Sequence, residues 1–185
     1  MKDKYIVLIV GESGSGKSTI CDELTKRYGL KQVKSYTTRP RRSEDEDGHT
    51  FISDEEFDKL ENICAYTYFD NHRYCATREQ VDNADLYIID PYGIGYFMEK
   101  YNGRKIPMVV YVHADKRIRR KRMEKRGDTT YKIRQRMAND KLAFVINVDE
   151  YAMCQYNNIE EGDVEKIATD IYRKFFRDSL GGENG

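Results

Sequence analysis

Short apolar segments recur along the chain and alternate with longer segments of helical periodicity. The clearest apolar segments are rich in β-branched residues and cover Tyr5–Val10, Leu86–Ile89 and Met108–Val112. Strands that are apolar at nearly every position are typical of a parallel sheet with both faces covered, because such strands have no solvent-facing side. The pattern therefore predicts an α/β fold in which a mostly parallel sheet of about five strands lies between two layers of helices.

Helical periodicity indicates five helices, and weaker apolar patterns indicate two further strands. The helices are expected at Ser18–Tyr28, Tyr92–Tyr101, Lys116–Arg126, Tyr131–Val145 and Val164–Arg177. The additional strands are expected at Gln32–Tyr36 and, as a short edge strand, at Tyr156–Ile159. The last helix has a plausible start at Asp163, and its apolar positions recur at helical spacing, which predicts packing against the core rather than a binding site.

Residues 35–85 interrupt the alternation of strands and helices. They begin with a polar, arginine-rich segment, continue with an acidic run at Glu44–Asp47, and then gather aromatic residues between Phe51 and Tyr74. Pro40 and Gly48 punctuate the start of this region. We expect one domain over residues 1–180, with a core at 1–34 and 86–180, a small insert at 35–85 that could move as a lid, and a flexible tail at 181–185.

Composition excludes several classes of protein. The 185 residues are 35% charged, but the 32 basic and 32 acidic residues balance, so net charge gives no reason to expect a nucleic-acid or membrane partner. The apolar segments are too short to cross a bilayer, and no basic-then-apolar leader precedes the first strand. Four dispersed cysteines without a CxxC motif, and three histidines without ligand spacing, favour a cytoplasmic protein without structural zinc.

The strongest motif directly follows the first apolar segment. Gly11–Ser18 reads GESGSGKS and fits G-x-x-x-x-G-K-[ST] at every fixed position. Gly14 and Gly16 allow the backbone N–H groups to curl around a phosphate, and the helix that follows adds its positive N-terminal end. The alternative is an ordinary Gly/Ser-rich turn, but few such turns carry Lys-Ser at this position after an apolar strand.

The motif predicts a site for ATP and Mg²⁺. Lys17 would reach the β- and γ-phosphates, and the Ser18 hydroxyl would hold the magnesium ion. The expected ATP-binding residues form one continuous segment: Gly11, Glu12, Ser13, Gly14, Ser15, Gly16, Lys17, Ser18 and Thr19.

Two further groups of arginines point to phosphate chemistry. Arg39 and Arg42 stand three residues apart on a polar segment and could bind phosphate oxygens bidentately across a cleft from the P-loop, whereas Arg41 is expected to be exposed. The alternative for this group is a solvated basic turn. The second group lies in and after Lys116–Arg126, which holds eight Lys or Arg in eleven residues.

This basic helix allows three interpretations. It could bind nucleic acid, it could be a solvated face, or it could be a lid over the transferring phosphoryl group. We favour a lid at 122–136, because Arg122 and Arg126 lie one turn apart on one face and Arg136 could approach from the next helix. The segment Gly127–Thr130 supplies the break that a mobile lid needs.

The order of these motifs resembles the guanylate kinase family. The segment Ser35-x-Thr-Thr-Arg39-x-x-Arg42, with Gly48 and Phe51 after it, is similar to the acceptor-binding segment of that family, and residues 122–136 look like its ATP lid. The resemblance covers most of residues 4–177. It implies that Ser35 touches the acceptor base and that Arg39 and Arg42 grip the acceptor phosphate.

The resemblance also implies roles for Tyr74 and Asp90. Tyr74 would lie against the acceptor, and Asp90 would lie near magnesium and acceptor. An acid that closes an apolar strand also suits a Walker-B role, directly or through water, although Asp90 could simply start the turn before Pro91.

Three positions depart from the family's pattern. Ala65 stands where the family places the glutamate that reads guanine, Ala76 stands where it places a serine or threonine, and His49 stands where it places a phosphate-contacting tyrosine. Loss of hydrogen-bonding partners removes discrimination between bases. Asp70 or Asn71 could supply a substitute from the same region.

The sequence therefore predicts a nucleoside-monophosphate kinase of the guanylate-kinase type, with ATP and Mg²⁺ as cofactors and GMP or dGMP as first candidate acceptors. The expected catalytic residues are Lys17, Arg39, Arg42, Arg122, Arg126 and Arg136. Small nucleotides are the expected partners, without a membrane or nucleic acid. Two alternatives remain: a P-loop kinase for another mononucleotide or a polynucleotide end, and a guanylate-kinase-like module that binds partners without catalysis.

Overall fold

A computed structural model describes residues 4–41, 44–69 and 71–177. Its main sheet contains four parallel strands in the order β6–β1–β7–β8. The strands are β1 (Tyr5–Val10), β6 (Leu86–Ile88), β7 (Ile106–His113) and β8 (Ala152–Asn157). Because β1 and β7 lie in the middle of the sheet, the side chains of residues 6–10 and 109–112 are buried on both faces, as the apolar sequences predict, whereas Ile106 at the start of β7 is exposed.

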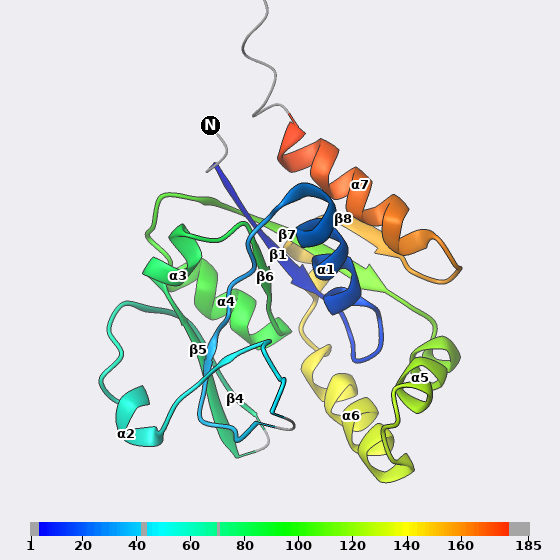
Figure 1. The fold of residues 1–185 in the computed structure, drawn as a ribbon, viewed down its shortest axis with the longest axis horizontal. Helices are drawn as coiled ribbons and strands as arrows, with labels where there is room; N and C mark the ends of the chain where they lie inside the picture. The colour runs from blue at the N-terminus through cyan, green and yellow to red at the C-terminus, as the bar shows by residue number, and fades with distance from the viewer. Residues whose placement is uncertain (1–3, 42–43, 70, 178–185) are drawn as a thin grey trace, which may run out of the picture.

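Helices cover both faces of the main sheet (Figure 1). On one face, α1 (Lys17–Tyr28) and α7 (Asp163–Phe175) pack Leu24 and Ile171 against Val7 and Ile9. On the other face, α4 (Pro91–Lys100) packs Phe97 against the sheet. The result is the three-layer P-loop α/β fold that the sequence predicts.

The expected elements are largely confirmed. The three apolar strands and all five helices are present, with ends that shift by one or two residues. The strand expected at Gln32–Tyr36 does not form: Gln32 makes only an isolated parallel bridge to Leu86, and Tyr36 belongs to another sheet. The described main sheet therefore has four strands rather than about five. The edge strand β8 also starts four residues earlier than predicted.

A second sheet lies beside the main one and has the order β3–β2–β5–β4. Its strands are β2 (Tyr36–Thr37), β3 (Thr50–Phe51), β4 (Ile63–Phe69) and β5 (His72–Thr77). The short helices α2 (Asp54–Phe57) and α3 (Arg78–Asp82) follow β3 and β5. Ala65 on β4 contributes to the core cluster that contains Phe97 of α4, so the two sheets share hydrophobic core.

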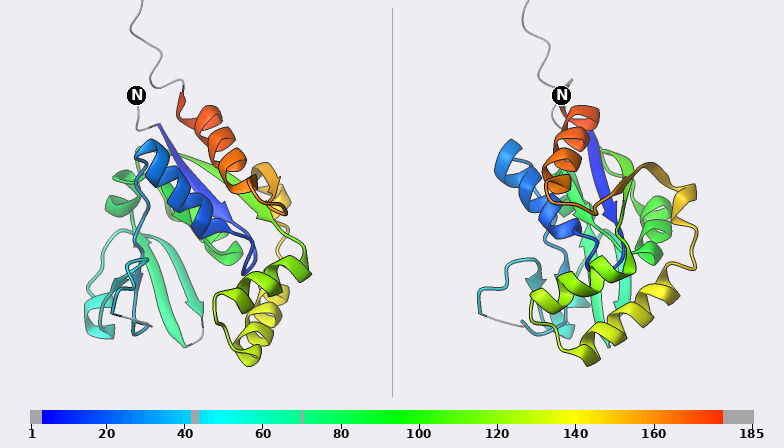
Figure 2. Two further views of the ribbon diagram at one scale, coloured as in Figure 1. Left: turned by 45° about the vertical axis from the view of Figure 1, so that its right-hand side comes forward. Right: turned by 90° about the vertical axis from the view of Figure 1, so that its right-hand side faces the viewer.

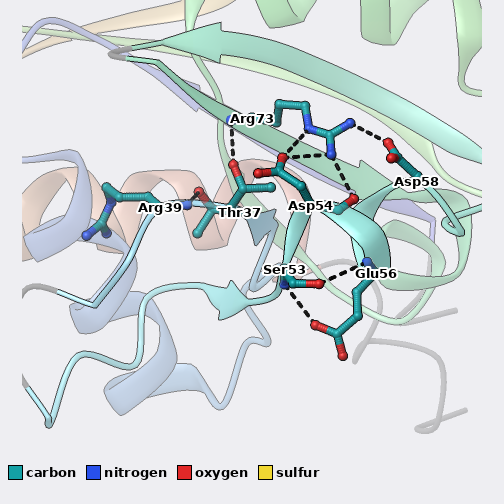
Figure 3. A network of polar contacts seen from close by, with 8 residues as sticks. Thr37, Arg39, Ser53, Asp54, Glu56, Asp58 and Arg73 are labelled. Atoms are coloured by element: carbon teal, nitrogen blue, oxygen red, sulfur yellow. Dashed lines mark hydrogen bonds and ion pairs between the residues drawn. The ribbon is translucent and has the colours of Figure 1, made fainter.

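Arg73 fastens α2 to the second sheet (Figure 3). Its Nε donates to Asp54 Oδ1 at 3.0 Å, and its Nη1 pairs with Asp58 Oδ1 at 2.6 Å. A capping box at the start of this four-residue helix satisfies the backbone N–H groups of Ser53 and Glu56. Neighbouring side chains of a strand point to opposite faces of the sheet. Because Arg73 lies on the face that carries α2, Tyr74 lies on the opposite face.

The remaining helices, α5 (Lys116–Lys125) and α6 (Thr130–Ala143), form a pair below the main sheet and opposite the second sheet (Figure 2). The 3₁₀ helix η1 (Val148–Glu150) leads from this pair to β8. Both the P-loop and α5 follow the carboxyl ends of strands, where ligands of open α/β sheets bind. Within the part of the chain that the structure describes, none of the helices is long and apolar enough to cross a membrane.

Candidate active site

The P-loop connects the carboxyl end of β1 to α1. Gly14 and Gly16 have φ angles of 79° and 99°, in the left-handed region that only glycine enters at little cost. Gly16 is the N-cap of α1 and supplies no side-chain acceptor, so no cap engages the first N–H groups of the helix. These groups and the helix dipole form the kind of cradle that binds phosphate oxygens.

Lys17 is held inside this loop. Its ammonium donates to the carbonyl oxygens of Gly11 and of Glu12, the latter at 3.0 Å. Burial lowers the pKa of Lys17 to about 8, and the nearby carboxylate of Asp140 partly opposes this shift. The side chain therefore lies where phosphates would bind, and its charge responds to pH near neutrality.

A cavity of about 430 Å³, called the nucleotide-side cavity below, opens on one side of the P-loop. The start of α1 contributes Lys17, Ser18 and Thr19, while α5 contributes Arg122 and its C-cap contributes Arg126. Ser18, the residue predicted to hold magnesium, therefore lines this cavity.

The three arginines of the predicted lid, Arg122, Arg126 and Arg136, line this cavity. Arg122 donates to the carbonyl of Ser15 at 3.3 Å, and burial lowers its pKa. Arg126 pairs with Asp128, and Arg136 lies 4.0 Å from the same carboxylate. Asp128 therefore connects the two helices across the turn that joins them.

A second cavity, of about 490 Å³, lies between the P-loop, the second sheet and α6 and is called the acceptor-side cavity below. Three of the five predicted acceptor-binding residues, Ser35, Tyr74 and Asp90, line this cavity. Ser35 and His49 are joined by a hydrogen bond of 2.9 Å between Oγ and Nδ1. Aromatic residues of β4 and α4 supply much of the remaining wall, which suits a planar base.

Asp90 has two local partners. Its Oδ1 accepts a hydrogen bond from Gly93 N at 3.0 Å, so it is the N-cap of α4, and Oδ2 accepts one from Thr67 Oγ1 at 2.5 Å. The structural role expected of an aspartate before Pro91 is therefore present. Because Asp90 also lines the acceptor-side cavity, this role does not remove it from the site.

Arg39 is buried but lines neither cavity. Its guanidinium binds both carboxylate oxygens of Glu46 and the carbonyl of Pro40. Arg41 is exposed, as expected, and stacks over Phe51. Arg42, the second predicted phosphate-binding arginine, lies outside the described residues.

Two of the three departures from the guanylate kinase pattern, Ala65 and Ala76, fall on the second sheet, and the third, His49, directly precedes β3. Ala65 and Ala76 are paired on β4 and β5, and both are buried. Ala65 lines the acceptor-side cavity and offers it no hydrogen-bonding group. Thr67, two residues along the same face of β4, also lines the cavity, and its hydroxyl already donates a hydrogen bond to Asp90. Asn71 is exposed at the turn between β4 and β5, and Asp70 lies outside the described residues.

Three residues that the motifs did not identify also contact the P-loop. Asp140 of α6 accepts hydrogen bonds from Ser13, Arg119 of α5 pairs with Glu12, and Asn158 after β8 donates to the carbonyl of Ser15 at 2.8 Å. Arg119 belonged to the basic helix but had no separate signal. Nothing in the local sequence around Asp140 or Asn158 indicates a contact with a loop more than 100 residues away.

The two cavities share three lining residues: Ser13, Lys17 and Arg136. Two bound molecules, one in each cavity, would therefore meet beside a lysine and an arginine. That arrangement is suited to the transfer of a negatively charged group from one molecule to the other.

Comparison with known proteins agrees with this fold. The family model for the AAA domain matches residues 7–160, so the chain belongs to the AAA domain family. A solved guanylate kinase from Anaplasma phagocytophilum has a TM-score of 0.61 at 17% identity, over 99% of this chain and 89% of that one. An uncharacterized protein from Eubacterium ventriosum has a TM-score of 0.52 at 13% identity, over 93% and 98%. No curated protein matches the chain.

Proposed function

We propose that this protein is an ATP-dependent nucleoside-monophosphate kinase of the guanylate-kinase type. The γ-phosphoryl group of ATP·Mg²⁺ would pass to the phosphate of a mononucleotide, giving ADP and a nucleoside diphosphate. The observation that carries the proposal is the junction of the two cavities at Ser13, Lys17 and Arg136. One cavity is lined by most of the P-loop and the other by three of the predicted acceptor residues, Ser35, Tyr74 and Asp90, so the two substrates would lie end to end.

The residues present fit ATP and magnesium. The uncapped N-terminus of α1 offers N–H groups to phosphate, and Ser18 is exposed in the nucleotide-side cavity, where its hydroxyl would hold the ion. Asp90 would contribute through water, since both of its oxygens already accept hydrogen bonds from the protein. When bound there, magnesium would supply positive charge that offsets part of the charge of the phosphates.

The protein's own contribution is positioning and charge neutralisation. An ionised acceptor phosphate is already a nucleophile, so no general base is required. Lys17 and Arg136 would stabilise the charge on the transferring group, and Arg122 and Arg126 would approach it from α5. Arg39 and Arg42 would hold the acceptor phosphate. For this, the phosphate would replace the Glu46 carboxylate as the partner of Arg39. Closure of the lid at 122–136 and the insert at 35–85 would exclude water.

GMP or dGMP is the first candidate acceptor, because Ser35, Arg39 and Tyr74 match the guanylate kinase pattern. Another mononucleotide is the second candidate, and the observation that favours it is the alanine pair Ala65 and Ala76 on the wall of the second sheet. An aromatic cavity without the usual base-reading acid would bind bases by stacking and would discriminate weakly. A non-catalytic binding module is less well supported, since the P-loop is complete.

Formation of ADP across a panel of acceptors tests the proposal. The panel contains the ribo- and deoxy-monophosphates of all bases and an oligonucleotide with a free 5′ or 3′ end. A monophosphate kinase produces ADP only with one or more mononucleotides, a polynucleotide kinase produces it with the oligonucleotide, and a binding module produces none. Lys17→Ala serves as the control for contaminating activity, because it removes the charge at the junction of the cavities.

A further inference from the structure

Asp140 of α6 accepts hydrogen bonds from the P-loop on both of its carboxylate oxygens. The backbone N–H of Ser13 donates to Oδ2 at 3.0 Å, and the Ser13 hydroxyl donates to Oδ1 at 2.9 Å. Backbone N–H groups of a P-loop are the donors that bind phosphate oxygens. Here one of those donors already binds an anionic group of the protein.

Arg119 of α5 completes this contact. Its Nη1 donates to Asp140 Oδ2 at 3.0 Å, and its Nη2 pairs with Glu12 Oε1 at 3.0 Å. The side chain of Arg119 is 8% exposed and that of Asp140 is 13% exposed, so solvent screens the pairs only weakly. The backbone of α5 also touches the loop, because a Cβ on Gly14 would lie 2.7 Å from the Arg119 carbonyl oxygen.

The position of this contact matters for the reaction. Ser13 lines both cavities and Asp140 lines the acceptor-side cavity, so their hydrogen bonds lie where the two substrates would meet. A phosphoryl group bound by Ser13 and Lys17 would face the Asp140 carboxylate at close range, and two anions in a partly buried site repel each other. The carboxylate and the phosphate therefore compete for one donor.

We propose that Asp140 is a competing anion on the P-loop, which the terminal phosphate of the nucleotide must displace in order to bind Ser13. The inference rests on the proposed function, since it assumes a nucleotide in the P-loop. Charge supports it: Glu12 and Asp140 balance Lys17 and Arg119, so release of Asp140 leaves the loop positively charged. Asp140 thereby weakens the binding of triphosphates, and its displacement frees the carboxyl-terminal half of α6 from the loop.

Binding of a non-hydrolysable ATP analogue with Mg²⁺, measured by titration calorimetry, tests the competition. Asp140→Ala and Asp140→Asn are expected to lower the dissociation constant of the analogue about tenfold, the effect of losing one or two competing hydrogen bonds. Inorganic tripolyphosphate should show the same gain, because the effect belongs to the phosphates and not to the base. Asp149→Asn is the matched control: it removes an equal charge from η1, where Asp149 accepts a hydrogen bond from Gln155 of β8 instead of from the P-loop, and it should change nothing.

The thermal midpoint separates competition from a purely structural role. Asp140→Ala should lower the melting temperature and nevertheless bind more tightly, whereas loss of a residue that only shapes the P-loop, or that holds the magnesium ion, would weaken binding. Weaker or unchanged binding in both variants overturns the inference; if the alanine variant does not fold, the nearly isosteric asparagine variant decides. Failure of the wild-type protein to bind the analogue would instead overturn the proposed function, and the inference with it.

Discussion

Arg39 and Glu46 form a bidentate ion pair beside the second sheet. The distances are 2.6 Å between Nη2 and Oε1 and 3.2 Å between Nη1 and Oε2, and the arginine side chain is 8% exposed. Arg39 points away from the cluster of Arg73 and the acids of α2 (Figure 3). A carboxylate in this geometry presents two oxygens to the guanidinium fork, as a phosphate does. We therefore expect the Glu46 carboxylate to bind Arg39 in the absence of substrate, and the acceptor phosphate to replace it.

Arg39→Ala should raise the KM for the acceptor at least tenfold and leave the KM for ATP unchanged, because a charge-assisted bidentate contact contributes about 1.5–3 kcal/mol. Glu46→Gln should act in the opposite direction and lower the acceptor KM, since it removes the competing charge. Steady-state kinetics with each substrate varied in turn would measure both effects. Arg104→Ala is the control, because Arg104 is exposed and lines neither cavity. An unchanged acceptor KM in Arg39→Ala would show that the acceptor phosphate binds elsewhere.

Nucleotide affinity should depend on pH through Lys17. Burial lowers the pKa of this ammonium to about 8, so its charge is present below that pH and is lost above it. The dissociation constant of an ATP analogue should therefore rise as pH increases from 8 to 9.5, where the phosphates are already fully ionised. Binding at pH 8.5 should also take up protons, visible as a dependence of calorimetric enthalpy on the buffer.

The same group gives a stability effect of defined sign. Between pH 8 and the ordinary lysine pKa of 10.5, the unfolded chain binds a proton at residue 17 that the folded chain lacks. Lys17 therefore makes the free energy of unfolding increase with pH in this window. Lys17→Ala should remove the lysine component of both trends. If the variant keeps the wild-type pH profile of affinity, another group is responsible.

Sequence order revealed those parts of the site that are contiguous in the chain. The P-loop could be identified because its glycines, lysine and serine occupy fixed positions within eight residues, next to a strand with an unambiguous apolar pattern. The strand expected at Gln32–Tyr36 was wrong because its apolar residues are few, and only Gln32 pairs with Leu86 before the chain leaves the main sheet. Tertiary pairing, not local preference, decided that segment.

Contacts across the fold could not be predicted in this way. Asp140 binds Ser13 over 127 positions of sequence, and Asn158 binds Ser15 over 143. Neither residue belongs to a local pattern, and their side chains meet the loop only because β1, β7 and β8 are neighbours in a parallel sheet. The pairing of Arg39 with Glu46 is local, yet sequence alone could not show whether an acid in the Glu44–Asp47 run turns toward the arginine or toward solvent.

Discrimination between bases should depend on position 65. Ala65→Glu should raise the preference for GMP over AMP, because an acid at this point of the acceptor-side cavity could accept hydrogen bonds from the guanine edge. Ala65 is 2% exposed, so the new carboxylate should also destabilise the protein by roughly 1–3 kcal/mol without ligand, and GMP should restore part of that loss.

Relative kcat/KM for GMP and AMP measures the effect, with thermal unfolding as the accompanying readout. Ala65→Gln is the matched variant, with the same size and no charge, and should favour GMP less. No gain in GMP preference by the folded glutamate variant would mean that the base does not lie against β4. In that case the aromatic residues of the cavity, rather than position 65, would hold it.

Arg136 should act on the rate of transfer more than on binding. It is the one described residue of α6 that lines both cavities, and it lies with Lys17 at their junction. A guanidinium there would stabilise charge that is greatest in the transition state, so Arg136→Ala should lower kcat by about 10²–10³ while the KM values change little. Arg134→Ala, two residues away and exposed, removes the same charge from α6 and should leave kcat near the wild-type value. Single-turnover measurements would locate the loss in the chemical step. A rise in the ATP or acceptor KM with unchanged kcat would instead assign Arg136 to substrate binding, and the junction of the cavities would not be the place of transfer.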